Sequence, residues 1–283
     1  MRRARIFTLG LLTGFSIWAA AVEGGWVIDQ VVPTDPTHGR HQVVLQANRL
    51  KTLLSAADGS PTFAFILDLN AETITQVDYR EHRYMTATVA EYVHTFQQAQ
   101  QEASKRAAEE LRQMEEQIRE MPADQREVME RMLQAQREQA TPSRQDCSEP
   151  RLEFRKTREE ATIAGYRAIR YDVLADGKPD SEIWTASGIT AWTEIDRQKL
   201  EQVMTAMAAA TPRCAPGQRR QRPPGSDPAW RLATEGYAVR TVDRTGTPTT
   251  VEVVRAEKRT VRDAEFQAPA GFARRTLREM LGR

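Results

Sequence analysis

Residues 62–86 read TFAFILDLNAETITQVDYREHRYMT, and this stretch decides the fold class. In its first third every second side chain is large and apolar, which is the period of a β-strand with one buried face. The turn pairs Asn70-Ala71 and Arg80-Glu81 separate it from two further strand-like segments, 72–79 and 82–86. Short strands joined by tight turns predict an antiparallel meander with one apolar face. The alternating positions of the first segment are Phe63, Phe65, Leu67 and Leu69.

Further segments with a strand-like residue pattern precede and follow this meander in the sequence. The pair Asp176-Gly177 lies between two of these segments and is typical of a hairpin turn. About ten or eleven strands with intervening helices predict an α+β protein, built as one large antiparallel sheet curved over helices. A short helix is expected at 194–208. The additional strand segments are 26–32, 41–47, 49–54, 151–159, 162–163, 167–174, 181–185, 230–243 and 249–259.

A helical insertion is predicted between Thr88 and Gln139, where apolar residues recur at steps of three and four. Pro122 interrupts this pattern and suits the first turn of a second helix, so we expect a helical hairpin or a kinked helix. The second helix carries Met129 and Met132, whose flexible side chains could form a surface for variable ligands. The simpler interpretation, which we favour, is that the apolar stripe packs on the sheet.

The N-terminus has the order of a secretory signal peptide. A basic start with three arginines precedes the apolar run 6–18, and Ala19–Ala21 supply small residues for cleavage. A membrane anchor is the alternative, but polar residues follow before the roughly 20 apolar positions that a span needs. We therefore expect cleavage near Ala21 and export to the periplasm. One domain at 22–272, a basic tail at 273–283 and no transmembrane segment would remain.

The two cysteines, Cys147 and Cys214, each lie in a Pro-rich polar stretch. An oxidising compartment favours a disulfide between them, which would close a long loop and stabilise the fold by about 4 kcal/mol. Two unpaired thiols are the alternative.

Composition and motifs exclude several classes of function. With 40 Lys+Arg against 39 Asp+Glu, the chain lacks the clustered positive charge of a general nucleic-acid binder. His38 and His41 are three residues apart but have no thiolate or carboxylate partner at ligand spacing, so a metal site is not predicted. Signatures of nucleophile elbows, phosphate-binding loops and zinc proteases do not occur. We expect a non-catalytic protein without a cofactor.

Several short segments in a fixed order resemble an uncharacterised family of exported bacterial proteins related to the outer-membrane lipoprotein carrier (LolA/LolB-like) superfamily. The resemblance implies an unclosed, strongly curved half-barrel with helices on its concave side, and in carrier relatives that hollow holds acyl chains. The segments span nearly all of the mature chain. They are 48–51, 63–68, 121–130, 163–173, 236–240 and 266–272.

Two functions follow as hypotheses. The first is a periplasmic protein that binds a lipid or a lipoprotein acyl chain in the concavity of the sheet. The second is an interaction or envelope-stress module that binds another envelope protein through the helical hairpin. For the first, the expected ligand-binding side chains are Phe63, Phe65, Leu67, Tyr84, Met129, Met132, Tyr171 and Val173.

Overall fold

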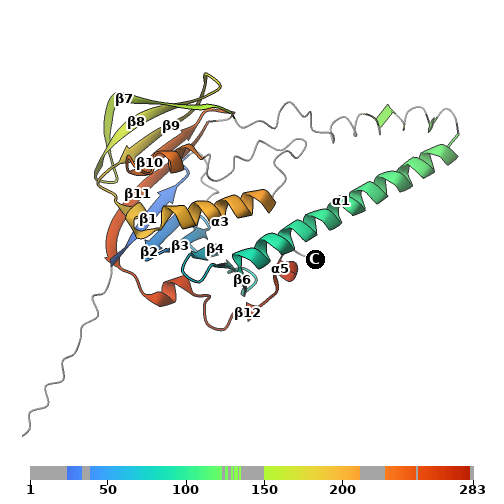
Figure 1. Cartoon of the computed structure of the whole chain (residues 1–283), viewed down its shortest axis with the longest axis horizontal. Coiled ribbons are helices and arrows are strands. Elements are labelled where there is room, and N and C mark those ends of the chain that lie inside the picture. The colour runs from blue at the N-terminus through green and yellow to red at the C-terminus, as the bar shows by residue number, and fades with distance from the viewer. Residues whose placement is uncertain are drawn as a thin grey trace, which may run out of the picture.

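The computed structural model describes residues 24–33, 39–122, 125–126, 129, 131–132, 134, 150–210, 227–246 and 248–280 (Figure 1). Its strands are β1 (Gly24–Val31), β2 (His41–Gln46), β3 (Arg49–Ser55), β4 (Pro61–Asp68), β5 (Thr73–Asp78), β6 (Arg83–Thr88), β7 (Leu152–Ile163), β8 (Tyr166–Ala175), β9 (Lys178–Ala186), β10 (Tyr237–Asp243), β11 (Thr249–Thr260) and β12 (Ala273–Arg274). Its helices are α1 (Val89–Glu120), α3 (Arg197–Ala210), α4 (Pro228–Arg231) and α5 (Leu277–Met280), with short 3-10 turns η2 (Ala191–Glu194) and η4 (Asp263–Phe266).

All twelve strands belong to one unclosed sheet in the order β12-β6-β5-β4-β3-β2-β1-β11-β10-β9-β8-β7. Every pairing is antiparallel except that of the two-residue β12 with β6. The predicted α+β class and the large antiparallel sheet with a helical insertion are therefore confirmed. The N-terminal β1 pairs with β11 near the C-terminus, so the pairing joins the two meanders into a single sheet.

Turn chemistry sets the strand boundaries. Asp176 and Gly177 both have positive φ, 51° and 78°, and they form the two-residue loop between β8 and β9 as predicted. Asn48 adopts φ 65° between β2 and β3. Asparagine tolerates this left-handed conformation better than most residues.

The two faces of the sheet are covered by different parts of the chain. The face that carries α3, η2 and α4 is called here the helix-side face, and its core includes Ile28, Leu45, Leu67 and Val253. The opposite face, called the strap-side face, is covered around η4, where Val261 and Phe266 pack against the sheet; its sheet residues are Val27, Val44, Ala64, Ile66 and Val77.

Three boundaries differ from the sequence prediction. The segments 151–159 and 162–163 form one strand, β7, whose register against β8 shifts between Lys156 and Glu160. Residues 230–236 are not strand, because Asp227 caps α4 through a hydrogen bond to the Ala229 N–H. The strand begins only at Tyr237. The predicted helix at 194–208 corresponds to α3, which begins three residues later, at Arg197, and runs to Ala210; the 3-10 turn η2 precedes it.

Helix α1 begins at a capping box in which Thr88 and Glu91 exchange hydrogen bonds, and it ends before Pro122. Its first turns pack on the core through Val89 and Tyr92, but the helix then extends well beyond the sheet (Figure 1). Ala107, which belongs to the predicted apolar stripe, is exposed. Packing on the sheet therefore accounts for only the first part of the stripe. Most of the expected second helix lies outside the described residues.

No helix in the described part of the chain combines the length and apolarity that a membrane crossing requires. The expected signal peptide, Cys147 and Cys214 lie outside the described residues.

Candidate ligand-binding cavity

Three aromatic side chains from distant segments meet on the helix-side face. Trp192 of η2 stacks on Tyr237 of β10, with ring centroids 5.5 Å apart and an interplanar angle of 26°. Trp230 of α4 meets Trp192 edge-on, with centroids 5.0 Å apart. The Arg197 guanidinium lies over the Trp230 ring at 5.0 Å. Offset stacking and edge-to-face contacts are favourable geometries for aromatic pairs, so this cluster fixes η2 and α4 on the sheet.

The position of Trp192 is held by contacts between η2 and the β2–β3 turn. The Asn48 N–H donates to the carbonyl oxygen of Glu194 at 2.7 Å, and the Lys258 ammonium lies 3.2 Å from the Glu194 carboxylate. Asp196 then caps α3, since its carboxylate accepts hydrogen bonds from the N–H groups of Gln198 and Lys199.

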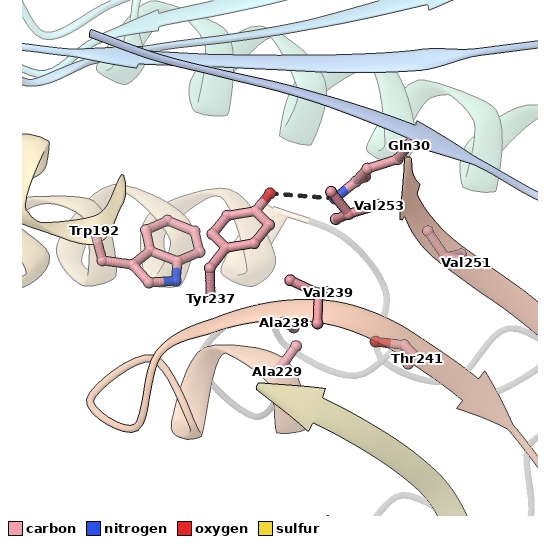
Figure 2. A pocket seen from close by; sticks show the side chains of 9 residues that line it. All are labelled: Gln30, Trp192, Ala229, Tyr237, Ala238, Val239, Thr241, Val251 and Val253. Atoms are coloured by element: carbon pink, nitrogen blue, oxygen red, sulfur yellow. Dashed lines mark hydrogen bonds between the residues drawn. The ribbon is translucent and has the colours of Figure 1, made fainter. Parts of the chain in front are cut away.

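A cavity of about 140 Å³ lies between this aromatic cluster and strands β1, β10 and β11 (Figure 2). Its walls are mostly apolar, with polar atoms from Gln30, Thr241 and Tyr237. Gln30 and Thr241 share one face of the sheet, because Gln30 lies directly opposite Val253 and Thr241 opposite Val251. The Tyr237 hydroxyl reaches Gln30 on this face. The full lining is Gln30, Trp192, Ala229, Tyr237, Ala238, Val239, Thr241, Val251 and Val253.

Tyr237 is the most deeply placed polar residue of the cavity, with 5% of its surface exposed. Its hydroxyl oxygen accepts a hydrogen bond from Gln30 Nε2 at 3.2 Å (Figure 2). Burial raises the pKa of Tyr237 well above its ordinary value, so the phenol is neutral near pH 7. The side chain therefore offers hydrogen bonds rather than charge.

Two buried side-chain nitrogens of the aromatic cluster, one on the cavity lining and one outside it, have no hydrogen-bond partner within the described residues. They are Trp192 Nε1, on a residue of the lining, and Arg197 Nε, on the residue that covers Trp230. Buried polar groups are usually paired with protein or ordered water. The arrangement can bind an apolar molecule that presents a hydrogen-bond acceptor.

The cavity is not lined by the ligand-binding residues expected from the sequence. Phe63, Phe65 and Leu67 do share the helix-side face, but they lie on β4, four strands away from β11. Leu67 is fully buried in the protein's own core, and Phe65 packs against that core. Tyr171 and Val173 form a separate buried cluster with Ile183 and Leu232.

The three remaining expected residues, Tyr84, Met129 and Met132, are not part of the cavity lining either. Tyr84 points to the strap-side face, because it pairs with Val77, which in turn pairs with Ala64. The expectation that Tyr84 shares a face with Phe65 was therefore wrong. Phe65 pairs with Gln76, and Gln76 pairs with Met85, so Met85 and not Tyr84 lies on the same face as Phe65. Met132 is 63% exposed and Met129 is half-buried.

Sequence reasoning missed the cavity because its walls come from five separate elements, β1, η2, α4, β10 and β11. Tyr237 was part of an expected strand, 230–243, and of a segment of family resemblance, but it was not singled out as a ligand-binding residue. Trp192 lies in a part of the sequence without a motif. The register of β1, β10 and β11 brings these residues together, and pairing of the two chain ends was not visible in the local pattern.

Comparisons with known proteins give little further information. No family model and no curated protein match the chain. The solved structure of an uncharacterized conserved protein from Thermus thermophilus is similar at 8% identity and a TM-score of 0.37, over 89% of this chain and 90% of that one. PNGF-II is similar at 9% identity and a TM-score of 0.34, over 92% of this chain and 32% of that one. At these TM-scores neither likeness carries an argument about function.

Proposed function

We propose that this protein is a non-catalytic binder of a hydrophobic ligand, such as a lipid or an acyl chain, in the cavity between η2, α4 and strands β1, β10 and β11. The observation that carries the proposal is an apolar cavity of about 140 Å³ on the helix-side face, lined by Val239, Val251 and Val253. Apolar pockets with a few convergent polar groups are the usual form of small-molecule sites.

The volume limits what the cavity holds. An apolar cavity of about 150 Å³ in another protein is large enough for benzene. This cavity therefore accepts a ring or the end of a chain, and the remainder of a longer ligand would lie outside. Widening at Ala229 would require α4 to move, which would break the edge-on contact between Trp230 and Trp192.

The proposed location is the periplasm, as in the carrier proteins that the sequence resembles. The support is the order of charge, apolarity and small residues in positions 1–21. Intact-mass measurement of protein recovered from the periplasmic fraction would test this. A mature chain beginning at Val22 is expected, and a full-length chain that stays in the cytosol would contradict the proposal.

Filling the cavity tests the binding proposal. Val251→Phe places a larger side chain in the wall, whereas Val254→Phe adds the same group at an exposed position of the same strand. A fluorescent fatty acid should bind the Val251→Phe variant at least about tenfold more weakly than the wild type. It should bind the Val254→Phe variant like the wild type. Equal binding to all three proteins, each shown to be folded by circular dichroism, would overturn the proposal.

A second candidate function is docking on α1. The observation that favours it is that the middle of its apolar stripe, before the buried Ile118, is exposed or half-buried. Ala107 is exposed, and Leu111 and Met114 are half-buried. The occupant we propose is a second copy of this chain. In an antiparallel pair of helices, Ala107 of one copy would face Leu111 of the other, so that small and large side chains complement each other. On the flank of the stripe, Arg106 would lie beside Glu110 of the other copy.

Light scattering over a range of protein concentrations tests this second candidate. The wild type and Lys105→Glu, a change on the opposite, charged side of α1, should form dimers. Leu111→Glu should stay monomeric. A wild type that remains monomeric at every concentration, or a Leu111→Glu variant that still dimerises, would contradict it.

A further inference from the structure

The polar pair in the cavity wall, Gln30 and Tyr237, indicates the chemistry of the ligand. The two residues lie on β1 and β10, with β11 between them. They reach each other along the helix-side face, where Gln30 Nε2 and the Tyr237 hydroxyl oxygen are 3.2 Å apart. Figure 2 shows this contact at the edge of the cavity, beside Val253.

Counting donors and acceptors shows that the pair retains an unused hydrogen. The Tyr237 oxygen accepts from the Gln30 amide, and within the described residues this is the hydrogen bond found for the phenol. The phenol proton is then left without an acceptor, although the residue is almost completely buried. If the amide is turned over, the phenol donates to the amide oxygen and the amide NH₂ retains free hydrogens. In the first arrangement the free donor is the buried phenol, and in the second it is the amide of the half-buried Gln30. In both, a ligand in the cavity can accept this hydrogen bond in place of an ordered water.

The other residues of the lining indicate whether a charged or a neutral acceptor group fits the cavity. None of the nine lining residues carries a positive charge, and Tyr237 stays neutral near pH 7. Burying a carboxylate without a cationic partner costs far more than burying a neutral carbonyl that accepts a hydrogen bond. A neutral oxygen therefore fits this wall better than an anionic one.

We infer that the ligand presents a neutral carbonyl oxygen, as in an ester, amide or ketone, to the Gln30–Tyr237 pair. This inference rests on the proposed function, because it assigns a ligand class to the same cavity. It makes Gln30 and Tyr237 specificity-determining residues, while the valines supply apolar contact. A free fatty acid would bind through its hydrocarbon end, with its carboxylate outside the cavity.

Three isosteric probes separate the inference from the proposed function. Cumene has no polar group, acetophenone has a ketone and benzoate has a carboxylate. Each would be titrated calorimetrically, near pH 7, into the wild type and into the double variant Gln30→Met/Tyr237→Phe. Both residues are changed together because either one alone could still donate to the ligand. Cumene binding to the double variant serves as the control for an intact cavity.

We expect the double variant to lose at least about tenfold in affinity for acetophenone and to change less than about twofold for cumene. Benzoate should bind far more weakly than acetophenone. If cumene binds but the double variant affects both neutral probes equally, the inference is overturned and the proposed function stands. Tighter binding of benzoate than of acetophenone would likewise overturn the inference and leave the proposed function standing. If none of the three probes binds the wild type, the proposed function itself is overturned.

Discussion

The side-chain oxygen of Asn48 accepts a hydrogen bond at 2.6 Å from the backbone N–H of Asp196, 148 residues further along the chain. With the bond from the Asn48 N–H to Glu194, it ties the β2–β3 turn to the junction between η2 and α3. Asn48→Gly preserves the positive φ and removes the acceptor, so we expect a loss of about 1 kcal/mol in urea unfolding. Asn48→Ala should lose about 1 kcal/mol more, since alanine is strained in the left-handed region. Equal stability of both variants and the wild type would show that this junction is not held by the turn.

Gly236 should be far less replaceable than Gly59. Gly236 has φ 140°, and a Cβ there would lie 2.5 Å from the backbone of Ala186 on β9, whereas a Cβ at Gly59 would meet nothing within 4 Å. Gly59→Ala therefore carries only the left-handed strain, about 1 kcal/mol. Gly236→Ala must also displace the start of β10, so we expect a loss of more than about 3 kcal/mol in thermal or urea unfolding. A Gly236→Ala variant as stable as Gly59→Ala would contradict the close packing of β10 on β9.

The ion pair between Glu265 and Arg259 should make part of the stability depend on acid pH. The Arg259 guanidinium donates to both carboxylate oxygens, at 3.0 and 2.9 Å, and this hydrogen bonding lowers the pKa of Glu265. Its stabilisation is present above the unfolded pKa of about 4.3, and it is lost as pH falls through the lower folded pKa.

Glu265→Gln tests this dependence. The variant should be less stable than the wild type by about 0.5–1 kcal/mol near neutral pH. That difference should shrink at pH values below about 4, where the wild-type carboxyl becomes protonated. The free energy of unfolding would be measured for both proteins across this range. A difference that stays constant or grows in acid would rule out the pair as its source.

The disulfide between Cys147 and Cys214 stays a prediction. Thiol titration of protein purified without reductant and unfolded in denaturant should find no reactive thiol. Two reactive thiols per chain would show that the pair is not oxidised.

Most strands of the sheet could be predicted because the residue pattern that identifies a strand lies within the strand and its turns. Alternation in residues 62–69 and the turn at Asp176-Gly177 depend only on neighbouring residues. By contrast, β12 has only two residues, which are too few to show an alternating pattern. The residues of α4 have a strand-like pattern, but the Asp227 cap stabilises a helix there instead.

The candidate cavity could not be predicted in the same way. Gln30 and Tyr237 come into contact only because β1 and β10 both pair with β11. The large apolar residues chosen from the sequence, such as Leu67 and Val173, are instead buried in the core. Apolar alternation identifies a buried face, but it does not distinguish the filled part of that face from a part that leaves a cavity.

Mass spectrometry of lipids extracted from the protein tests the central claim most directly. The wild type and the Val251→Phe variant would be purified in parallel from the periplasm without detergent. We predict that a carbonyl-bearing hydrophobic molecule copurifies with the wild type at a fixed stoichiometry and is depleted from the variant. A wild type that is reproducibly empty, or a variant that carries the same molecule in the same amount, would contradict the account.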